Sequence, residues 1–193
     1  MQAITLDLSP VVELTHDIFA TICQYNQRFH FERTYKGELM IFHPAFTGTG
    51  GKNSYISGML FMWNEKMRLG IAFDSSTGFT LPNSAIRSPD ASWIPHERWN
   101  KLTHQEQHEQ FSPICPDFVV ELMSFSDRLK PTKEKMEEWQ TNGCRLGWLI
   151  DTKNENVYIY RGDGSTDMIK SFDDIASGED VLPDFELALE RLR

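Results

Sequence analysis

The sequence lacks the features that several classes of protein require. Its three cysteines are an odd number at wide spacings, with no C-x-x-C pair, which argues against a disulfide framework and favours a reducing, cytoplasmic setting. The start of the chain has no basic segment followed by an apolar core, so no signal peptide is expected. No run of about 18 apolar residues occurs, which argues against a membrane-spanning helix.

Positive charge is also scarce. The chain has 19 Lys and Arg residues against 28 Asp and Glu residues, a formal net charge of −9 at pH 7. Strong non-specific binding to nucleic acid is therefore not expected, because such binding depends on Lys and Arg side chains that neutralise phosphates. A local basic patch is compatible with this balance, and a metal ion held by carboxylates would remove part of the local negative charge.

The sequence does contain enough apolar material for one core. It has 193 residues, of which 40% are hydrophobic and 12% aromatic, and this predicts a single domain over residues 1–193. Hydrophobic spacing and turn signals predict helices over residues 11–28, 53–68 and 132–142, and a helical excursion over 95–112. Predicted strands cover residues 35–42, 71–74, 78–81, 86–94, 117–123, 145–150 and 156–160, with a further strand and a short amphipathic end after residue 165.

This order of elements predicts an α/β (α+β) fold, with one mixed sheet flanked by helices. The segment from Val119 through the helix at 132–142 to Trp148 fits a parallel crossover, and the strands at 145–150 and 156–160 fit a hairpin. Residues 43–52 contain a proline and three glycines and are predicted to form a loop.

A carboxylate interrupts one of the most apolar predicted strands. Glu121 stands in Phe-Val-Val-Glu-Leu-Met, at a position where a buried strand favours Val, Ile or Leu. Burying an ionised carboxylate without a partner is strongly unfavourable, so such a residue is retained for a reason. Asp90 has a similar character, because it comes at the head of the apolar stretch Ala-Ser-Trp-Ile.

Together with Lys135 on the following helix, these two carboxylates suit a metal-dependent phosphodiester hydrolase. Mg²⁺ is held by one or two carboxylates together with phosphate and water oxygens, and adjacent strands can bring two carboxylates to one ion. A nearby lysine can orient or deprotonate the attacking water, or stabilise charge on the phosphate. The alternative interpretation is that Asp90 caps a turn, Glu121 faces solvent on an edge strand and Lys135 is an exposed helix residue.

Several motifs that carry these residues resemble the Uma-two family of restriction endonucleases, which belongs to the PD-(D/E)xK nuclease superfamily and was long a domain of unknown function. The resemblance runs roughly over residues 32–160 and is carried by Pro89-Asp90, Pro116 to Ser124, Lys135 to Gly143 and Leu146 to Asp151. It implies a restriction-endonuclease-like fold, dependence on Mg²⁺ or Mn²⁺, and cleavage of DNA. A homodimer is also expected, because a two-fold pair of sites suits two antiparallel strands.

The resemblance also implies roles for individual residues. Asp90 matches the first catalytic aspartate and Glu121 the strand carboxylate, so both are expected to hold the metal. The superfamily motif has a lysine two residues after that carboxylate, where this chain has Met123. The family is expected to supply the lysine from the next helix, as Lys135. Lys135 and Trp139 are four residues apart and so share one helix face.

Several other residues are functional candidates. Lys133 is a rival to Lys135 on another face of the same helix, and Glu32 and Glu38 are candidate supporting acids for which an ordinary exposed position is an equally good interpretation. The segment from Gly48 to Asn53 resembles a P-loop but lacks its first glycine and its Ser/Thr.

Two functions compete with a DNA endonuclease. The first is a catalytically silent nuclease-fold protein that acts as a binding or accessory protein, and the acidic net charge favours it slightly. The second is a zinc hydrolase that uses His104 and His108, whose i, i+4 spacing on a predicted helix can bind zinc. The polar residues around this pair favour a solvated helix instead.

Overall fold

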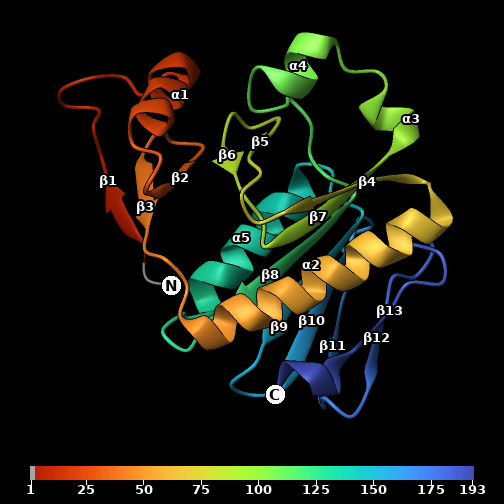
Figure 1. The fold of residues 1–193 in the computed structure, drawn as a ribbon. Helices are drawn as coiled ribbons and strands as arrows, with labels where there is room; N and C mark the ends of the chain where they lie inside the picture. Colours follow the sequence, from red (N-terminus) through yellow and green to blue (C-terminus); the bar gives the residue numbers. More distant parts are fainter. Residues whose placement is uncertain (1–2) are drawn as a thin grey trace.

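The computed structural model describes residues 3–193, and a six-stranded sheet forms its centre (Figure 1). The strands are β4 (Gly70–Asp74), β7 (Ala91–Pro95), β8 (Phe118–Met123), β9 (Leu146–Asp151), β10 (Asn156–Arg161) and β11 (Thr166–Ile169). Their order is β11-β10-β9-β8-β7-β4, with β8 and β9 parallel and the other pairs antiparallel. The predicted mixed sheet, the crossover from β8 to β9 and the hairpin of β9 and β10 are therefore confirmed.

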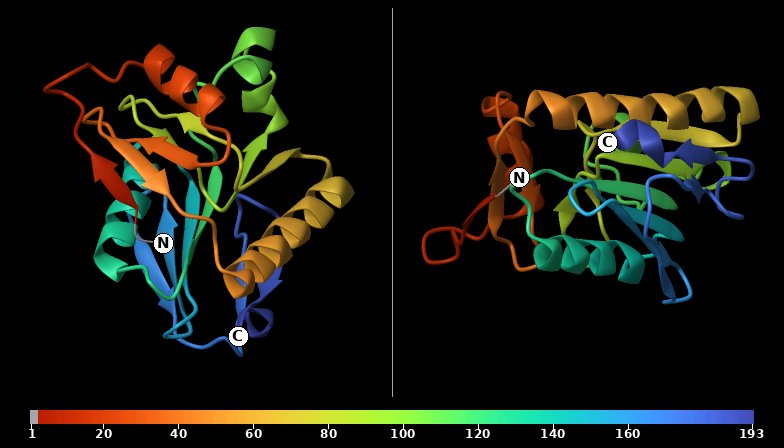
Figure 2. Two further views of the ribbon diagram at one scale, coloured as in Figure 1. Left: turned by 60° about the vertical axis from the view of Figure 1, so that its left-hand side comes forward. Right: turned by 90° about the horizontal axis from the view of Figure 1, so that it is seen from below.

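One long helix covers each face of this sheet. Helix α2 (Thr47–Met67) lies on one face and α5 (Leu129–Thr141) on the other, as the right-hand view of Figure 2 shows. On β8, Phe118, Val120 and Leu122 share a core with α2, whereas Val119 and Met123 pack in the core beneath α5. Because successive strand residues face opposite sides, Glu121 points to the α5 side.

A second sheet of five short strands lies beside the first. It has the order β1-β3-β2-β6-β5 and packs against α1 (His16–Tyr25). Its strands are β1 (Ile4–Leu6), β2 (His30–Arg33), β3 (Leu39–Phe42), β5 (Phe79–Thr80) and β6 (Ile86–Arg87). The prediction of one sheet was therefore wrong. The predicted strand 86–94 breaks at Ser88-Pro89-Asp90, since proline has no N–H for a ladder, and its two halves join different sheets.

The other predicted boundaries changed for local reasons. Helix α1 begins at His16 because the Thr15 side chain accepts a hydrogen bond from the Ile18 N–H and caps it. The predicted strand 35–42 is the second half of a hairpin, with a turn at Gly37, where φ is +82°. The predicted loop 43–52 is largely helical, because α2 begins at Thr47.

The remaining elements are small. The excursion after β7 contains α3 (His96–Trp99) and α4 (His104–His108), and the chain ends in the hairpin β12 (Ile175–Ser177) and β13 (Glu186–Ala188), followed by the 3-10 helix η1 (Leu189–Leu192). This C-terminal part contributes Phe185, Leu187 and Leu192 to the core on the α2 side of the sheet. None of the helices within residues 3–193 combines the length and apolarity needed to cross a membrane.

Candidate active site

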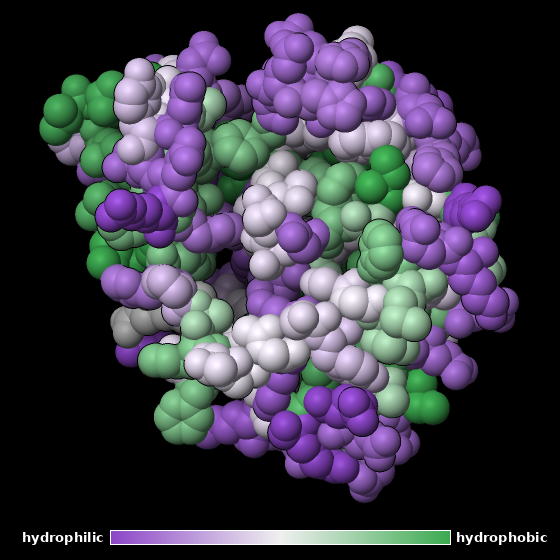
Figure 3. All heavy atoms as spheres, in the orientation of Figure 1, coloured by the Kyte–Doolittle hydropathy of each residue, from purple (hydrophilic) through white to green (hydrophobic). Residues whose placement is uncertain are grey.

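A cleft of about 960 Å³ lies between the five-stranded sheet, α5 and the start of α2. Figure 3 shows the molecule hollowed between the N-terminal part and α2. Asp90, Glu121 and Lys135 all line this cleft, although Asp90 and Lys135 are 45 residues apart in the chain. The structure therefore brings the three predicted site residues together at one place.

Asp90 is held rigidly beside the strand that carries Glu121. Its backbone N–H donates to the Val120 carbonyl at 2.9 Å, and its Oδ2 accepts from the Leu122 N–H at 2.7 Å. Its Oδ1 accepts from the Asn53 Nδ2 of α2 at 2.8 Å. Burial raises the pKa of Asp90, although the hydrogen bond from Leu122 opposes this shift. The structure thus places this carboxylate on the cleft wall, against β8.

Glu121 is buried on a central strand, so the interpretation of a solvent-facing edge residue is wrong. Its Oε1 accepts a hydrogen bond from Trp139 Nε1 at 2.8 Å, and its Oε2 accepts one from Lys135 Nζ at 3.0 Å. Burial raises the pKa of Glu121 to about 7; Lys135 opposes this shift, and the nearby carboxylates of Asp90 and Glu32 add to it. Such a site favours binding of a cation, because an added positive charge relieves this repulsion.

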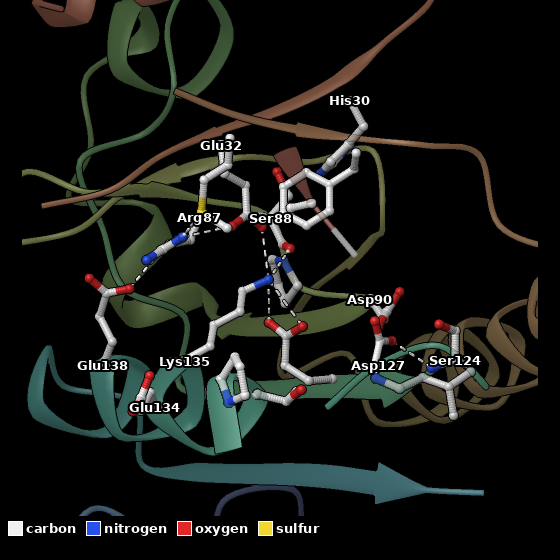
Figure 4. A pocket seen from close by; sticks show the side chains of 18 of the residues that line it. His30, Glu32, Arg87, Ser88, Asp90, Ser124, Asp127, Glu134, Lys135 and Glu138 are labelled. Carbon is white, nitrogen blue, oxygen red and sulfur yellow. Dashed lines mark hydrogen bonds and ion pairs between the residues drawn. The ribbon is translucent and has the colours of Figure 1, made fainter. Parts of the chain in front are cut away.

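Lys135 reaches from α5 into a ring of oxygens. Its Nζ lies 2.8 Å from Glu32 Oε1, 2.9 Å from Glu121 Oε1 and 3.1 Å from the Ser88 carbonyl (Figure 4). Burial alone would lower the pKa of Lys135, but the two carboxylates raise it well above its ordinary value. An ammonium held in this way is a charge stabiliser and an orienting donor, and it is poorly suited to deprotonate water. Its predicted rival, Lys133, instead lies over the Tyr158 ring, 4.1 Å from the centroid.

Glu32 and Arg87 extend this charge network. Glu32, on β2, has a side chain only 1% exposed, and its Oε2 accepts from Arg87 Nη1 at 2.9 Å. Burial alone would raise the pKa of Glu32, but Lys135 and Arg87 lower it to about 2. Arg87 Nε also donates to Glu138 Oε2 at 2.6 Å, so charges of alternating sign run from Glu138 to Glu121. The sequence alone pointed to Arg87 in one way, through its position in a predicted strand close to Asp90.

Two further cleft residues were not predicted. His30 stands two positions before Glu32 on β2, so both side chains share a face of the strand. Burial lowers the pKa of His30, and the nearby Glu32 carboxylate opposes this shift. Asn53 fixes Asp90 through the hydrogen bond to Oδ1, although the sequence pointed to it only through the failed P-loop pattern. Glu38 also lines the cleft, but it accepts a hydrogen bond from Thr34 rather than joining the network.

The histidine pair forms no metal site in the described part of the chain. His104 and His108 are exposed on α4, with ring centroids 4.7 Å apart. Within residues 3–193, no group of three or more His, Cys, Asp and Glu side chains is arranged to hold a metal ion. The structure therefore gives no support to the zinc hydrolase.

Comparison with known proteins identifies the family. The sequence profile of the Uma2 family, described as "Putative restriction endonuclease", matches residues 17–190. The chain belongs to the Uma2 family. A crystal structure described as a "putative nuclease belonging to DUF820", from Anabaena variabilis ATCC 29413, superposes on this Uma2 chain with a TM-score of 0.75 and 19% sequence identity. The match covers 92% of this chain and 96% of that one, and it bears out the predicted nuclease-like fold. No protein with a curated description matches the sequence.

The donor atoms of this Uma2 site fit a hard divalent cation. Asp90 and Glu121 supply carboxylate oxygens from adjacent chain segments, and the amide oxygen of Asn53 is buried with no hydrogen-bond partner among residues 3–193. Mg²⁺ prefers oxygen ligands, binds through one or two carboxylates, and completes its shell with water and substrate phosphate. An arrangement of two carboxylates in an open cleft suits Mg²⁺ better than an ion that requires a complete cage of protein ligands.

Proposed function

We propose that this protein is a Mg²⁺-dependent endonuclease that hydrolyses phosphodiester bonds in DNA. The observation that carries the proposal is the Glu121–Lys135 pair, buried next to Asp90 and open to a cleft. Membership of the Uma2 family supports a nuclease. The predicted roles follow, with Asp90 and Glu121 as metal ligands and Lys135 as the catalytic cation. Mn²⁺ is expected to substitute for Mg²⁺, since both are hard oxygen-seeking ions.

The side chains of the cleft have different roles in the proposed reaction. A bound Mg²⁺ would polarise the phosphoryl group and lower the pKa of a water molecule. Asp90 and Glu121 are positioned for the ion by hydrogen bonds from Leu122 and Trp139 respectively. The ammonium of Lys135 lies beside Glu121 and offers its positive charge to the extra negative charge that the phosphate acquires during attack. These roles require no proton transfer from Lys135.

Glu32 and Arg87 act as positioning residues in this proposal. Glu32 holds the Lys135 ammonium from the side opposite Glu121, and Arg87 in turn holds Glu32. A long lysine side chain would otherwise sample many rotamers. Glu32 and Arg87 therefore reduce the conformational entropy that Lys135 loses when it meets the substrate. The arrangement also keeps Lys135 charged throughout the neutral pH range.

A nicking assay tests the proposal. Supercoiled plasmid incubated with the purified protein should convert to open-circular and then linear forms in the presence of Mg²⁺ or Mn²⁺, and EDTA should stop the conversion. A preparation that leaves plasmid and linear DNA intact with either ion would favour the rival function of a catalytically silent accessory protein. Light scattering of the same preparation tests the proposed homodimer, whose expected mass is twice the 22.4 kDa of one chain.

Metal binding is expected to be visible as thermal stabilisation. An ion that binds only the folded state at about 100 times its Kd adds roughly 2.7 kcal/mol of stability, which raises Tm by about 5–10 °C in a domain of this size. Mg²⁺ should produce this shift in the wild type and in Glu134→Gln, whose carboxylate is exposed on α5. Asp90→Asn and Glu121→Gln should lose most of the shift. An equal shift in all four proteins would place the ion elsewhere.

A further inference from the structure

The walls of the cleft are poorly suited to a DNA duplex. Among residues 3–193, eight carboxylate side chains line the cleft, against the side-chain cations Arg87, Arg128 and Lys135. Two of these three cations, Arg87 and Lys135, are already paired with carboxylates of the cleft itself. Binding of a duplex depends largely on Lys and Arg side chains that neutralise the phosphates of both strands. Even with a divalent ion bound, this cleft offers little free positive charge for a duplex.

Exposed aromatic rings lie beside this cleft, in which free positive charge is scarce. Phe125 is 81% exposed and lies between Ser124 and Ser126, which line the cleft. Phe46 is 72% exposed and directly precedes α2, next to the cleft residue Ala45. Both phenylalanines therefore directly adjoin residues that line the cleft, and Figure 1 shows the two segments that carry them, the loop before α5 and the start of α2. Single exposed rings are common on protein surfaces, so it is the position of these two beside the cleft that points to a ligand.

Lysines accompany two of the exposed rings around the cleft. The Lys153 ammonium lies 5.3 Å from the centre of the Phe125 ring. Tyr35 lines the cleft itself, and the Lys36 ammonium lies 5.7 Å from its ring centre. A ring on which a base can stack, next to a cation that can meet the adjoining phosphate, is typical of sites that bind single-stranded nucleic acid. Stacking on a ring requires an unpaired base, because the bases of a duplex are already stacked on each other.

The size of the cleft agrees with this chemistry. Its volume of about 960 Å³ lies at the upper end of the range for small-molecule pockets, roughly 300–1,000 Å³, and so admits a few nucleotides rather than a segment of duplex. Glu121 is buried at its floor, so the phosphate to be cleaved must enter the cleft to reach it. A flexible single strand can bend into such a cleft far more readily than a stiff duplex can.

We propose that the substrate of this site is unpaired DNA, such as a single-stranded segment, a flap or an open bubble. Bases stack on Tyr35 in the cleft and on Phe46 and Phe125 beside it, while a phosphate of the strand reaches Asp90 and Glu121. This proposal rests on the proposed nuclease function, since it names the substrate class of the same site. It assigns the exposed rings a part in substrate binding and leaves the chemistry to the carboxylates and Lys135.

Binding measurements with matched phenylalanine variants test the proposal. Fluorescence anisotropy with a labelled strand of about 20 nucleotides, and with its duplex, in Ca²⁺ at fixed salt should show at least about tenfold tighter binding of the single strand. Phe46→Ala and Phe125→Ala should each weaken single-strand binding by about 5- to 150-fold, the range for the loss of one stacked base. Phe61→Ala is the matched control, because Phe61 is 56% exposed on α2 and, unlike Phe46 and Phe125, has no chain neighbour that lines the cleft.

The outcomes separate the two proposals. Equal or tighter binding of the duplex, or Phe46 and Phe125 variants that bind like Phe61→Ala, would overturn the unpaired-DNA proposal whatever the nicking assay shows. Tenfold tighter binding of an RNA strand of the same sequence would overturn it as well. Selective, ring-dependent binding of the single strand supports it, and this result stands even if no DNA is cleaved, in which case only the nuclease proposal fails.

Discussion

Replacing Glu121 with glutamine is expected to abolish DNA cleavage while leaving the protein folded. The substitution keeps the shape of the side chain and its acceptor for Trp139 Nε1, but it removes a charged ligand of the proposed ion. Lewis-acid stabilisation by a metal ion contributes several kcal/mol to the transition state. Since each 1.36 kcal/mol changes a rate about tenfold, the expected loss is about 10³-fold or more. The measurement is the initial rate of cleavage in saturating Mg²⁺.

The fold of this variant can be checked through the pH dependence of stability. The pKa of Glu121 in the folded protein is about 7, above the ordinary glutamate value of 4.5 that applies to the unfolded chain. An acid whose pKa is raised by folding contributes stability that is complete below pH 4.5 and is lost as pH rises through 7. Without metal at pH 8, Glu121→Gln should therefore melt at or above the wild-type temperature. The loss of activity then reflects the site rather than unfolding.

Glu134→Gln is the matched control for the activity measurement. Glu134 lines the same cleft and carries the same charge, but its side chain is exposed and its nearest cation is Lys130, at 3.9 Å. It should retain most of the wild-type rate. Cleavage that survives in Glu121→Gln at the rate of Glu134→Gln would remove the carboxylate of Glu121 from the mechanism and, with it, the proposed metal site.

The parts of this site that could be predicted were those determined by local sequence. Glu121 was conspicuous because a carboxylate in an apolar strand is physically costly, and the structure places it on the strand face that the alternation of β8 dictates. Lys135 followed from the spacing along one helix and from the resemblance to a family. The parallel crossover between β8 and β9 was predictable because a helix separates two apolar strands.

The charge network could not be predicted, because it depends on contacts between distant parts of the chain. Glu32 and Lys135 are 103 residues apart, and their contact requires a second sheet that the strand pattern did not reveal. The break at Pro89 was readable in principle, but the sequence alone did not say that the chain changes sheets there. Similarly, the glycines before Asn53 have low helix propensity, and the sequence alone therefore predicted a loop there. Packing of Ile56 and Leu60 of α2 against the large sheet overrides this propensity.

The same network implies a large loss of stability when its central cation is removed. In Lys135→Met, Glu121 loses the ammonium that contacts both of its oxygens, and Glu32 keeps Arg87 as its remaining partner. Breaking a buried ion pair by removing one partner typically costs about 3–5 kcal/mol, because the other charge is left buried. We expect a loss of this size at pH 8, measured by urea denaturation in the absence of metal.

The pH dependence of this loss identifies its cause. Without Lys135 the pKa of Glu121 should rise above 7, so at pH 5 the carboxyl is protonated and the cost of burying it is small. Glu32 behaves in the opposite way: its pKa of about 2 means that its contribution is complete above pH 4.5 and is lost only as the pH falls toward 2. The stability difference between wild type and Lys135→Met should therefore be clearly larger at pH 8 than at pH 5.

Two further variants make this test decisive. Lys133→Met is the same substitution two residues earlier on α5, where the lysine ammonium lies over the Tyr158 ring, and it should cost less than about 1 kcal/mol at either pH. The double variant Lys135→Met with Glu121→Gln should recover part of the stability at pH 8, because it removes the unpaired carboxylate. A Lys135→Met protein that is no less stable than Lys133→Met at pH 8 would show that Lys135 does not neutralise the buried carboxylates, and the charge-based account of this cleft would then be wrong.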